Sequence, residues 1–251
     1  MSSSAPSIVK AKNFAADNCT YGAPRINKRG GKNVSVLYEG RPLVVQFPLT
    51  LSYGINERVD EATSRVTYDV ALQFGPEDET PSGILRKGLR ELEEKILTDA
   101  VTNGQSWFNK GNMTRDVASA LMYPILKHPK NKDTGEPDLD RNPTLKLKVV
   151  YWDDEFKCEL FDMEQNVLYS KHLDKTDSSP VDLVPQKSHL TGLFECQGIW
   201  FAGGRFGVTW KLLQAKVRPP VKIQGYCMLD DSDEEDAVAS VLQAEKELRR
   251  T

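Results

Sequence analysis

Residues 190–202 (LTGLFECQGIWFA) and 205–218 (RFGVTWKLLQAKVR) are two runs rich in apolar and aromatic side chains, and the pair Gly203-Gly204 separates them. A tight hairpin turn needs positive φ at both central residues, which glycine adopts at little cost. Strand-forming runs on both sides of such a pair are typical of a β-hairpin. We therefore expect a long hairpin in this part of the chain.

Similar runs lie toward the N-terminus. Residues 34–49 predict two strands around a turn at Glu39-Gly40, because apolar side chains alternate on both sides of the turn. Pro42 and Pro48 cannot donate a backbone hydrogen bond to a neighbouring strand. Their presence favours sheet edges or strand ends in this region.

Further strands are expected at residues 65–74 and from residue 144 onward. In the segment 145–152 (LKLKVVYW) apolar residues alternate with Lys146 and Lys148. Successive side chains of a strand point to opposite faces. One face of this strand should therefore be apolar and the other basic.

The middle of the chain has a helical period instead. Apolar residues recur at spacings of three and four between residues 83 and 102, and Ser82 can cap the helix that they predict. Thr114 starts a shorter helix that should end near Pro124. Residues 128–143 consist of turn formers and charges and predict a long exposed loop.

These elements predict a mainly β fold with α insertions. Roughly eight or nine short strands with helices inserted mid-chain favour an OB-like Greek-key barrel, and a β-sandwich is the alternative. We expect residues 1–33 to be a disordered basic arm and residues 34–229 to form the barrel, with its helical insertion at about 83–127. Residues 230–251 should form an acidic segment followed by a short amphipathic C-terminal helix.

The composition argues against several classes of protein. No run of the 251 residues is apolar for long enough to span a bilayer, and residues 1–12 lack the apolar core of a signal peptide. We expect an intracellular soluble protein that does not bind membranes. The four cysteines and three histidines are not at zinc spacing, so we expect reduced thiols, no metal and no cofactor.

The charge is unevenly distributed. The formal net charge is −3, but residues 230–236 (DDSDEED) hold six acids and no base, so the rest of the chain carries +3. A mildly basic body with an acidic tail can bind a polyanion and also regulate that binding. The tail can do so by occupying the basic surface or by docking a basic partner, and a solvated disordered segment is the simpler reading. The acids in question are Asp230, Asp231, Asp233, Glu234, Glu235 and Asp236.

Residues 199–218 interleave aromatic rings with bases. Single-stranded DNA offers phosphates to cations and exposed base faces to aromatic rings. Each ring can instead be a core residue, and alternation places Trp210 on the opposite face of its strand from Lys211. The polar loop around residues 104–113 adds two adjacent aromatics and a lysine. The candidate DNA-binding residues are Arg25, Lys28, Arg29, Lys32, Trp107, Phe108, Lys110, Lys146, Lys148, Arg205, Phe206, Trp210, Lys211, Lys216 and Arg218.

Signals for catalysis are weak. Asp133-Thr134-Gly135 matches the tripeptide of aspartic proteases but lacks the flanking apolar strand, and the GGRFG segment at 203–207 lacks the lysine and helix of a P-loop. No serine stands in a nucleophile elbow. We expect no enzyme, although carboxylates from separated strands could still form a metal-dependent nuclease site.

Short motifs in a fixed order resemble a known family. They are VSVLYEGRPLVVQFP (34–48), WFNK (107–110), PTLKLKV (143–149), and GIWF with FGVTWKLLQAKV (198–217), followed by an acidic run. In this order they resemble the single-stranded-DNA-binding proteins of nucleocytoplasmic large DNA viruses. That group is similar to the replication single-strand binder of T-odd bacteriophages, and the likeness covers roughly residues 25–236.

The resemblance implies an OB fold and sequence-independent binding of single-stranded DNA in replication, recombination or repair. It implies that the acidic tail contacts replication proteins, such as a DNA polymerase or helicase, and competes with DNA. It allows a homodimer and implies a location in the host nucleus or a cytoplasmic virus factory. The residues that it places on the binding strands are Lys146, Lys148, Trp210, Lys211, Gln214 and Lys216.

The chain departs from the phage pattern at its end. In that pattern the acidic tail is terminal and closes on an aromatic residue, whereas here residues 237–251 follow it. The acidic run could thus be a linker to a partner-binding helix. A structural or adaptor protein of a virion or replication factory remains the alternative function, and a nonbasic concave face would favour it.

Overall fold

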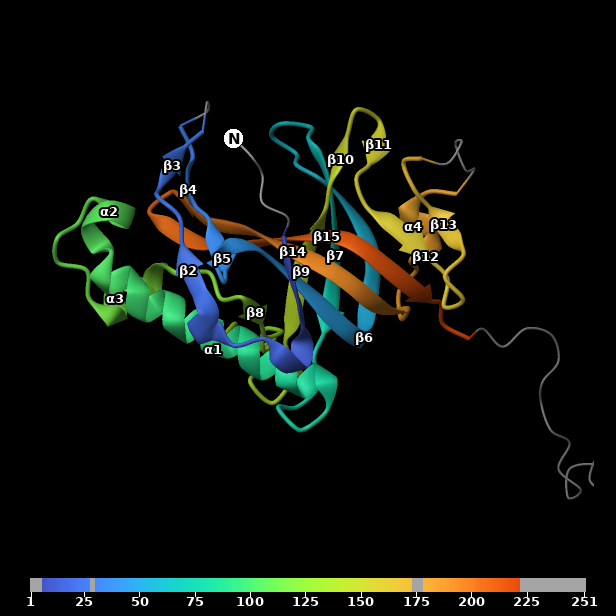
Figure 1. Ribbon diagram of the computed structural model, residues 1–251, viewed down its shortest axis with the longest axis horizontal. Coiled ribbons are helices and arrows are strands. Elements are labelled where there is room, and N and C mark those ends of the chain that lie inside the picture. Colours follow the sequence, from blue (N-terminus) through green and yellow to red (C-terminus); the bar gives the residue numbers. More distant parts are fainter. Residues whose placement is uncertain (1–5, 28–29, 173–177, 222–251) are drawn as a thin grey trace, which may run out of the picture. The chain divides into compact units, whose positions relative to one another are not determined.

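The computed structural model describes residues 6–27, 30–172 and 178–221 (Figure 1). The chain divides into a unit of residues Met1–Pro220 and a second unit of residues Val221–Thr251. Every helix and strand described belongs to the first unit. The acidic run, the expected C-terminal helix, Lys28 and Arg29 lie outside the described residues.

Five strands close into a barrel. β6 pairs with β7 and β7 with β9 in antiparallel fashion, β9 pairs with β15 in parallel, and β15 pairs with β14, which returns to β6. In chain order the ring therefore runs 1-2-3-5-4, which is a five-stranded Greek-key barrel of OB type. The closed ring replaces the alternative of a two-sheet sandwich and confirms the predicted fold class. The strands are β6 (Arg41–Val59), β7 (Val66–Gln73), β9 (Thr144–Val149), β14 (His189–Ala202) and β15 (Arg205–Arg218).

The expected C-terminal hairpin is confirmed as β14 and β15. Their register runs from His189 opposite Arg218 to Ala202 opposite Arg205. Gly203 and Gly204 turn the chain with φ of 57° and 76°. Both values lie where a residue with a side chain is disfavoured, which is why this turn uses two glycines.

The strand that contains both prolines differs in part from expectation. β5 (Val36–Tyr38) and β6 flank the predicted Glu39-Gly40 turn, and Pro42 stands near the start of β6. Pro48, however, lies inside β6, between the residues that pair with β1 (up to Gln46) and those that pair with β7 (from Leu51), so only β14 flanks β6 at this point.

A register shift in the pairing of β6 with β14 accommodates Pro48. Phe47 pairs with Gly192 and Thr50 with Leu190, so β6 has one residue more than β14 over this stretch. Residues within such a bulge do not take part in the regular ladder. The missing N–H of Pro48 is therefore tolerated in the middle of β6.

The expected disordered arm is wrong for the described residues of this region. Val9, Phe14 and Cys19 are buried in the core, and β1 pairs in parallel with β6. The strand that pairs with β1 in parallel lies more than 30 residues further along the chain. No neighbouring turn or hairpin therefore marks β1 in the sequence, and the segment resembles a polar tail. The elements are β1 (Ser7–Lys10), η1 (Ala11–Asn13), η2 (Ala16–Asn18), β2 (Cys19–Tyr21), β3 (Arg25–Ile26) and β4 (Lys32–Val34).

The helical insertion follows β7 as predicted. α1 (Pro81–Thr102) starts two residues earlier than expected, because the Thr80 side chain, rather than that of Ser82, accepts the hydrogen bond from Gly83 N–H. Its apolar face packs against β6 and the N-terminal segment, and it crosses the lower part of the view in Figure 1. α2 (Gly104–Phe108) and α3 (Arg115–Leu121) complete the insertion, and Thr114 caps α3 as predicted.

Small elements complete the described chain. The pair β10–β11 turns at Asp153-Asp154, where both residues have positive φ, as expected for a hairpin turn. No described helix is long and apolar enough to span a membrane. These elements are β8 (Leu126–Lys127), β10 (Tyr151–Trp152), β11 (Glu155–Phe156), β12 (Glu159–Phe161), β13 (Val167–Tyr169) and α4 (Pro180–Leu183).

Three cysteines are buried free thiols. Burial raises the pKa of Cys19, Cys158 and Cys196 to about 12 in each case. Such thiols remain protonated at neutral pH and react slowly. Cys227 lies outside the described residues.

The two faces of β9 should differ sharply in their effect on stability. Leu147 is fully buried, whereas the neighbouring Lys148 is exposed. We expect Leu147→Ala to lower the free energy of unfolding by about 2–5 kcal/mol through loss of packing and the cavity left behind. Lys148→Ala should change it by only about 0.5 kcal/mol. Urea unfolding of both variants checks this, and equal losses would contradict the burial of Leu147.

Candidate nucleic-acid interface

Three lysines lie together on the outer face of the barrel. Lys146 and Lys148 point outward from β9 because Leu145, Leu147 and Val149 fill the inward positions. Lys211 of β15 pairs in register with Lys148, so its side chain leaves the sheet on the same side. Neighbouring strands lie about 4.8 Å apart, which brings the three side chains into one patch. We call Lys146, Lys148 and Lys211 the lysine row.

A non-helical segment, residues 122–127, borders the lysine row. At one end Tyr123 N–H donates to the Phe206 carbonyl at 2.7 Å, and at the other end Leu126 pairs with Leu145. The segment thus crosses from the start of β15 to the start of β9. The Glu93 carboxylate of α1 accepts a hydrogen bond from Ile125 N–H, and burial raises the pKa of Glu93.

A groove of about 260 Å³ lies between this segment and the two strands. It is large enough to admit a single nucleobase. Its lining combines cations, rings and aliphatic side chains. Tyr123, Lys127, Lys146, Lys148 and Trp200 are among the residues that line it.

Two aromatic rings of the groove lie against each other. The ring centroids of Tyr123 and Trp200 are 5.4 Å apart at 44°, and Tyr123 is 39% exposed. Lys127 Nζ lies 5.4 Å and the Arg205 guanidinium carbon 5.3 Å from the Tyr123 ring centroid. Gly207 makes room for this arrangement, because a Cβ there would come within 2.9 Å of the Trp200 ring.

The groove therefore supplies both contacts that single-stranded nucleic acid needs. The exposed Tyr123 ring and the half-buried Trp200 ring can stack on bases, and the surrounding cations can bind phosphates. Of these residues, only Arg205 was predicted from the sequence as a site residue, and Tyr123, Trp200 and Lys127 were not. Trp200 belongs to the aromatic segment already noted, whereas the other two lie in a segment without periodicity.

Three predicted ring contacts are core residues instead. Phe206, Trp210 and Trp107 are all buried, and Trp210 packs edge-on against Phe194 with centroids 5.1 Å apart. Aromatic side chains bury large apolar areas, so the interior of the barrel is their favoured place. Each of the three is at most 3% exposed, so we do not propose base stacking on them, although Trp210 is part of the lining of the groove.

Two of the remaining candidates, Lys32 and Phe108, lie against Phe201 near the tip of the β14–β15 hairpin. Lys32 of β4 donates through Nζ to the Ser106 carbonyl at 2.5 Å and lies 5.8 Å from the Phe201 ring centroid. Phe108 is partly buried against Phe201, with centroids 5.2 Å apart. Arg25 and Lys110 are exposed in β3 and just after α2.

Three further candidates lie along the far half of β15, where β12 rather than β9 pairs with it. Gln214 donates through Nε2 to the Glu159 carboxylate at 2.6 Å. Lys216 is partly buried opposite Phe161, and Arg218 is exposed at the strand end. The structure does not bring these residues to the groove.

An exposed tryptophan lies beyond the end of β9. Trp152 in the β10–β11 hairpin is 66% exposed, whereas its neighbour Tyr151 packs against Tyr68 and Phe156 with centroids 5.4 Å and 4.8 Å away. Trp152 was not among the predicted site residues. Tyr151 is also 40% exposed, so both rings of this hairpin are accessible to solvent.

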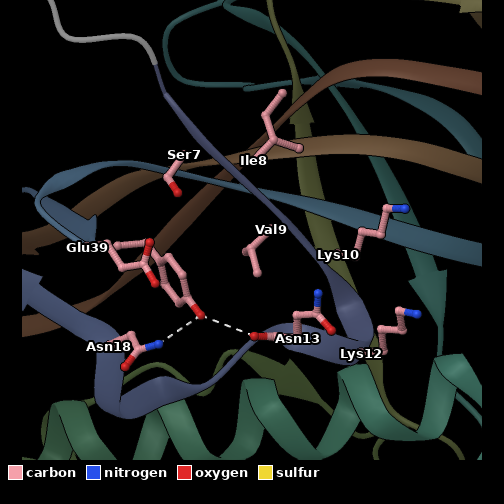
Figure 2. A pocket seen from close by; sticks show the side chains of 9 residues that line it. Ser7, Ile8, Val9, Lys10, Lys12, Asn13, Asn18 and Glu39 are labelled. Atoms are coloured by element: carbon pink, nitrogen blue, oxygen red, sulfur yellow. Dashed lines mark hydrogen bonds between the residues drawn. The ribbon is translucent and has the colours of Figure 1, made fainter.

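A larger hollow of about 530 Å³ beside β1 has a different character (Figure 2). The Tyr38 hydroxyl accepts from Asn18 Nδ2 and donates to the Asn13 carbonyl, each at 3.2 Å. Tyr38 is itself buried, so its ring offers no stacking face. Lys10 and Lys12 line this hollow, but its lining contains no exposed ring.

Among the residues that the structure describes, no group of three or more His, Cys, Asp or Glu side chains is arranged to hold a metal ion. Asp153, Asp154 and Glu155 stand at the β10–β11 turn. The acids of the 128–143 loop are exposed.

Comparison with known proteins gives similarity in structure only. No protein-family model matches the chain, and no curated protein matches its sequence. The single-stranded DNA-binding protein from bacteriophage Enc34 in complex with single-stranded DNA is similar, with a TM-score of 0.41 and 10% identity over 81% of this chain and 98% of that one. The crystal structure of gp2.5, a single-stranded DNA binding protein encoded by bacteriophage T7, is also similar. Its TM-score is 0.38, with 12% identity over 75% of this chain and 98% of that one. Both TM-scores are below 0.5. The assignment of the barrel therefore depends on the order of its strands and not on these similarities.

Proposed function

We propose that this protein binds single-stranded DNA without sequence preference and without catalysis. The observation that supports the proposal is the pair of rings, Tyr123 and Trp200, flanked by Lys127 and Arg205 and adjacent to the lysine row. The groove also borders β9, the third strand of the barrel. In OB folds the face of strands two and three and the loop between strands four and five are frequent oligonucleotide sites. Arg205 starts the strand after that loop.

The chemistry of the groove favours single strands over duplex. The bases of a duplex are stacked on each other, and a phenol ring cannot reach their faces. Stacking on an exposed base is tolerant of sequence because every base has a π-face. The groove is basic, and this counts against the adaptor alternative, which predicted a nonbasic concave face.

The proposed setting is the replication, recombination or repair of viral DNA, in the host nucleus or a cytoplasmic factory. Formation of a homodimer is part of the same proposal. The sequence motifs that resemble the viral family support this setting. The groove supports the proposal of DNA binding itself.

A titration with labelled oligo-dT and a blunt duplex of equal length tests the proposal. The single strand should bind more tightly, and the logarithm of its association constant should fall by about 0.7 per neutralised phosphate for each tenfold increase in salt. Equal affinity for both DNAs at low salt would reject the proposed function.

The acidic segment should weaken DNA binding when it is present. Deleting residues 230–251 is expected to tighten binding of oligo-dT, because six negative charges no longer compete with phosphate for the basic surface. A full-length variant with the six acids changed to Asn or Gln separates charge from the loss of residues 237–251. If both variants bind as the parent does, or more weakly, autoinhibition by the acidic segment is rejected.

A further inference from the structure

Asp69 is a carboxylate placed directly beneath two cations of the DNA-facing surface. It belongs to β7, the second strand of the barrel, and pairs in register with Lys148 of β9. Its Oδ2 accepts from Arg58 Nε at 2.6 Å and lies 3.0 Å from Lys146 Nζ. The side chain is only 7% exposed, and within the described part of the chain its Oδ1 has no hydrogen-bond partner.

The side chains of the two cations, Arg58 and Lys146, are far more exposed to solvent than that of Asp69. The side chains of Arg58 and Lys146 are 59% and 46% exposed, so both can meet a phosphate from solvent. The carboxylate remains shielded below them. One buried negative charge therefore offsets part of the positive charge that the face presents to DNA.

Lys146 can move away from Asp69 without leaving the Asp69 carboxylate unpaired. A buried charge that loses its only partner is strongly destabilising. Here Arg58 holds the same oxygen at the shorter distance. Lys146 can therefore exchange Asp69 for a phosphate while the Arg58–Asp69 pair persists.

We propose that Asp69 is an internal competitor for phosphate that lowers the affinity of the groove for single-stranded DNA through Lys146. This inference rests on the proposed function. Binding through Lys146 then replaces one ion pair by another, so its net gain is smaller than that of a free lysine. Asp69 is a positioning residue that sets the charge available to DNA.

The direct test is Asp69→Asn in the full chain, which keeps the shape of the side chain and removes its charge. We expect oligo-dT to bind about three- to tenfold more tightly at moderate salt, while the salt slope stays the same because Lys146 neutralises one phosphate in both proteins. Glu91→Gln is the matched control. It changes the net charge equally but lies on α1, where Glu91 pairs at 4.0 Å with the exposed Lys87. It should leave the affinity within about twofold of the parent.

A double-mutant cycle shows whether the effect passes through Lys146. In a Lys146→Ala background, Asp69→Asn should give little further tightening. A gain of the same size in both backgrounds would overturn the proposed role of Lys146, because it would reflect only the general change of charge.

A second comparison covers the case in which Asp69→Asn does not fold, as shown by loss of a cooperative thermal transition. Arg58→Gln and Arg58→Gln/Asp69→Asn differ by the same carboxylate, and in the latter no buried ion is left unpaired. The double variant should bind oligo-dT more tightly than Arg58→Gln alone. If the parent protein does not bind single-stranded DNA, the proposed function fails. If the parent binds but removing the Asp69 charge leaves affinity equal or weaker, only the present inference fails.

Discussion

Replacing Lys146 and Lys148 together with alanine is expected to weaken binding of oligo-dT by at least about 100-fold at roughly 0.1 M salt, since a hydrogen bond to a charged group contributes about 1.5–3 kcal/mol. Both side chains are exposed on β9 and line the groove beside Tyr123 and Trp200. The salt slope should fall by about 1.4, because two fewer phosphates are neutralised. Fluorescence anisotropy at several salt concentrations measures both quantities.

Lys130→Ala/Lys132→Ala is the matched control for this prediction. It removes the same charge from exposed lysines in the 128–143 loop. Its effect should stay below about threefold, since only long-range attraction is lost. A loss of affinity as large as that of the β9 pair would show that total charge, rather than the lysine row, determines binding.

Tyr123→Ala is expected to weaken binding by about five- to 150-fold, which corresponds to the 1–3 kcal/mol that stacking on one base contributes. The ring is 39% exposed and stands between Lys127 and Arg205. Removing an uncharged ring should leave the salt slope unchanged, in contrast to the lysine variants. This difference separates stacking from charge in the same titration.

Tyr123→Phe tests whether the ring itself makes the contact. It keeps the aromatic face and removes only the hydroxyl, so it should bind DNA nearly as well as the parent. If Tyr123→Phe is as weak as Tyr123→Ala, the hydroxyl is the important group. If Tyr123→Ala binds like the parent, the groove is not a base-stacking site.

The lysine row could be predicted because it depends on local alternation. Lys146 and Lys148 are separated by one residue in a strand with an apolar second face, and this spacing alone places them together outside the core. The same alternation placed Trp210 opposite to Lys211, and Trp210 is indeed buried. The barrel was predictable for a related reason, because its long strands and the Gly203-Gly204 turn have strong local patterns.

The aromatic part of the groove could not be predicted in this way. Tyr123 and Lys127 lie in a segment whose course is set by pairing with β15 and β9 and by the hydrogen bond from Ile125 N–H to Glu93. These contacts join residues that are far apart in the sequence. The N-terminal strand β1 was missed for the same reason, since its partner is the parallel strand β6.

The most direct test of the groove as the DNA-binding site is ultraviolet cross-linking of oligo-dT to the full chain, followed by mass spectrometry of the linked peptides. We expect cross-links at Tyr123 and Trp200, and their loss when excess unlabelled single strand competes. Cross-links confined to Trp152, or the absence of any specific cross-link from a folded protein under binding conditions, would contradict a binding site in the groove.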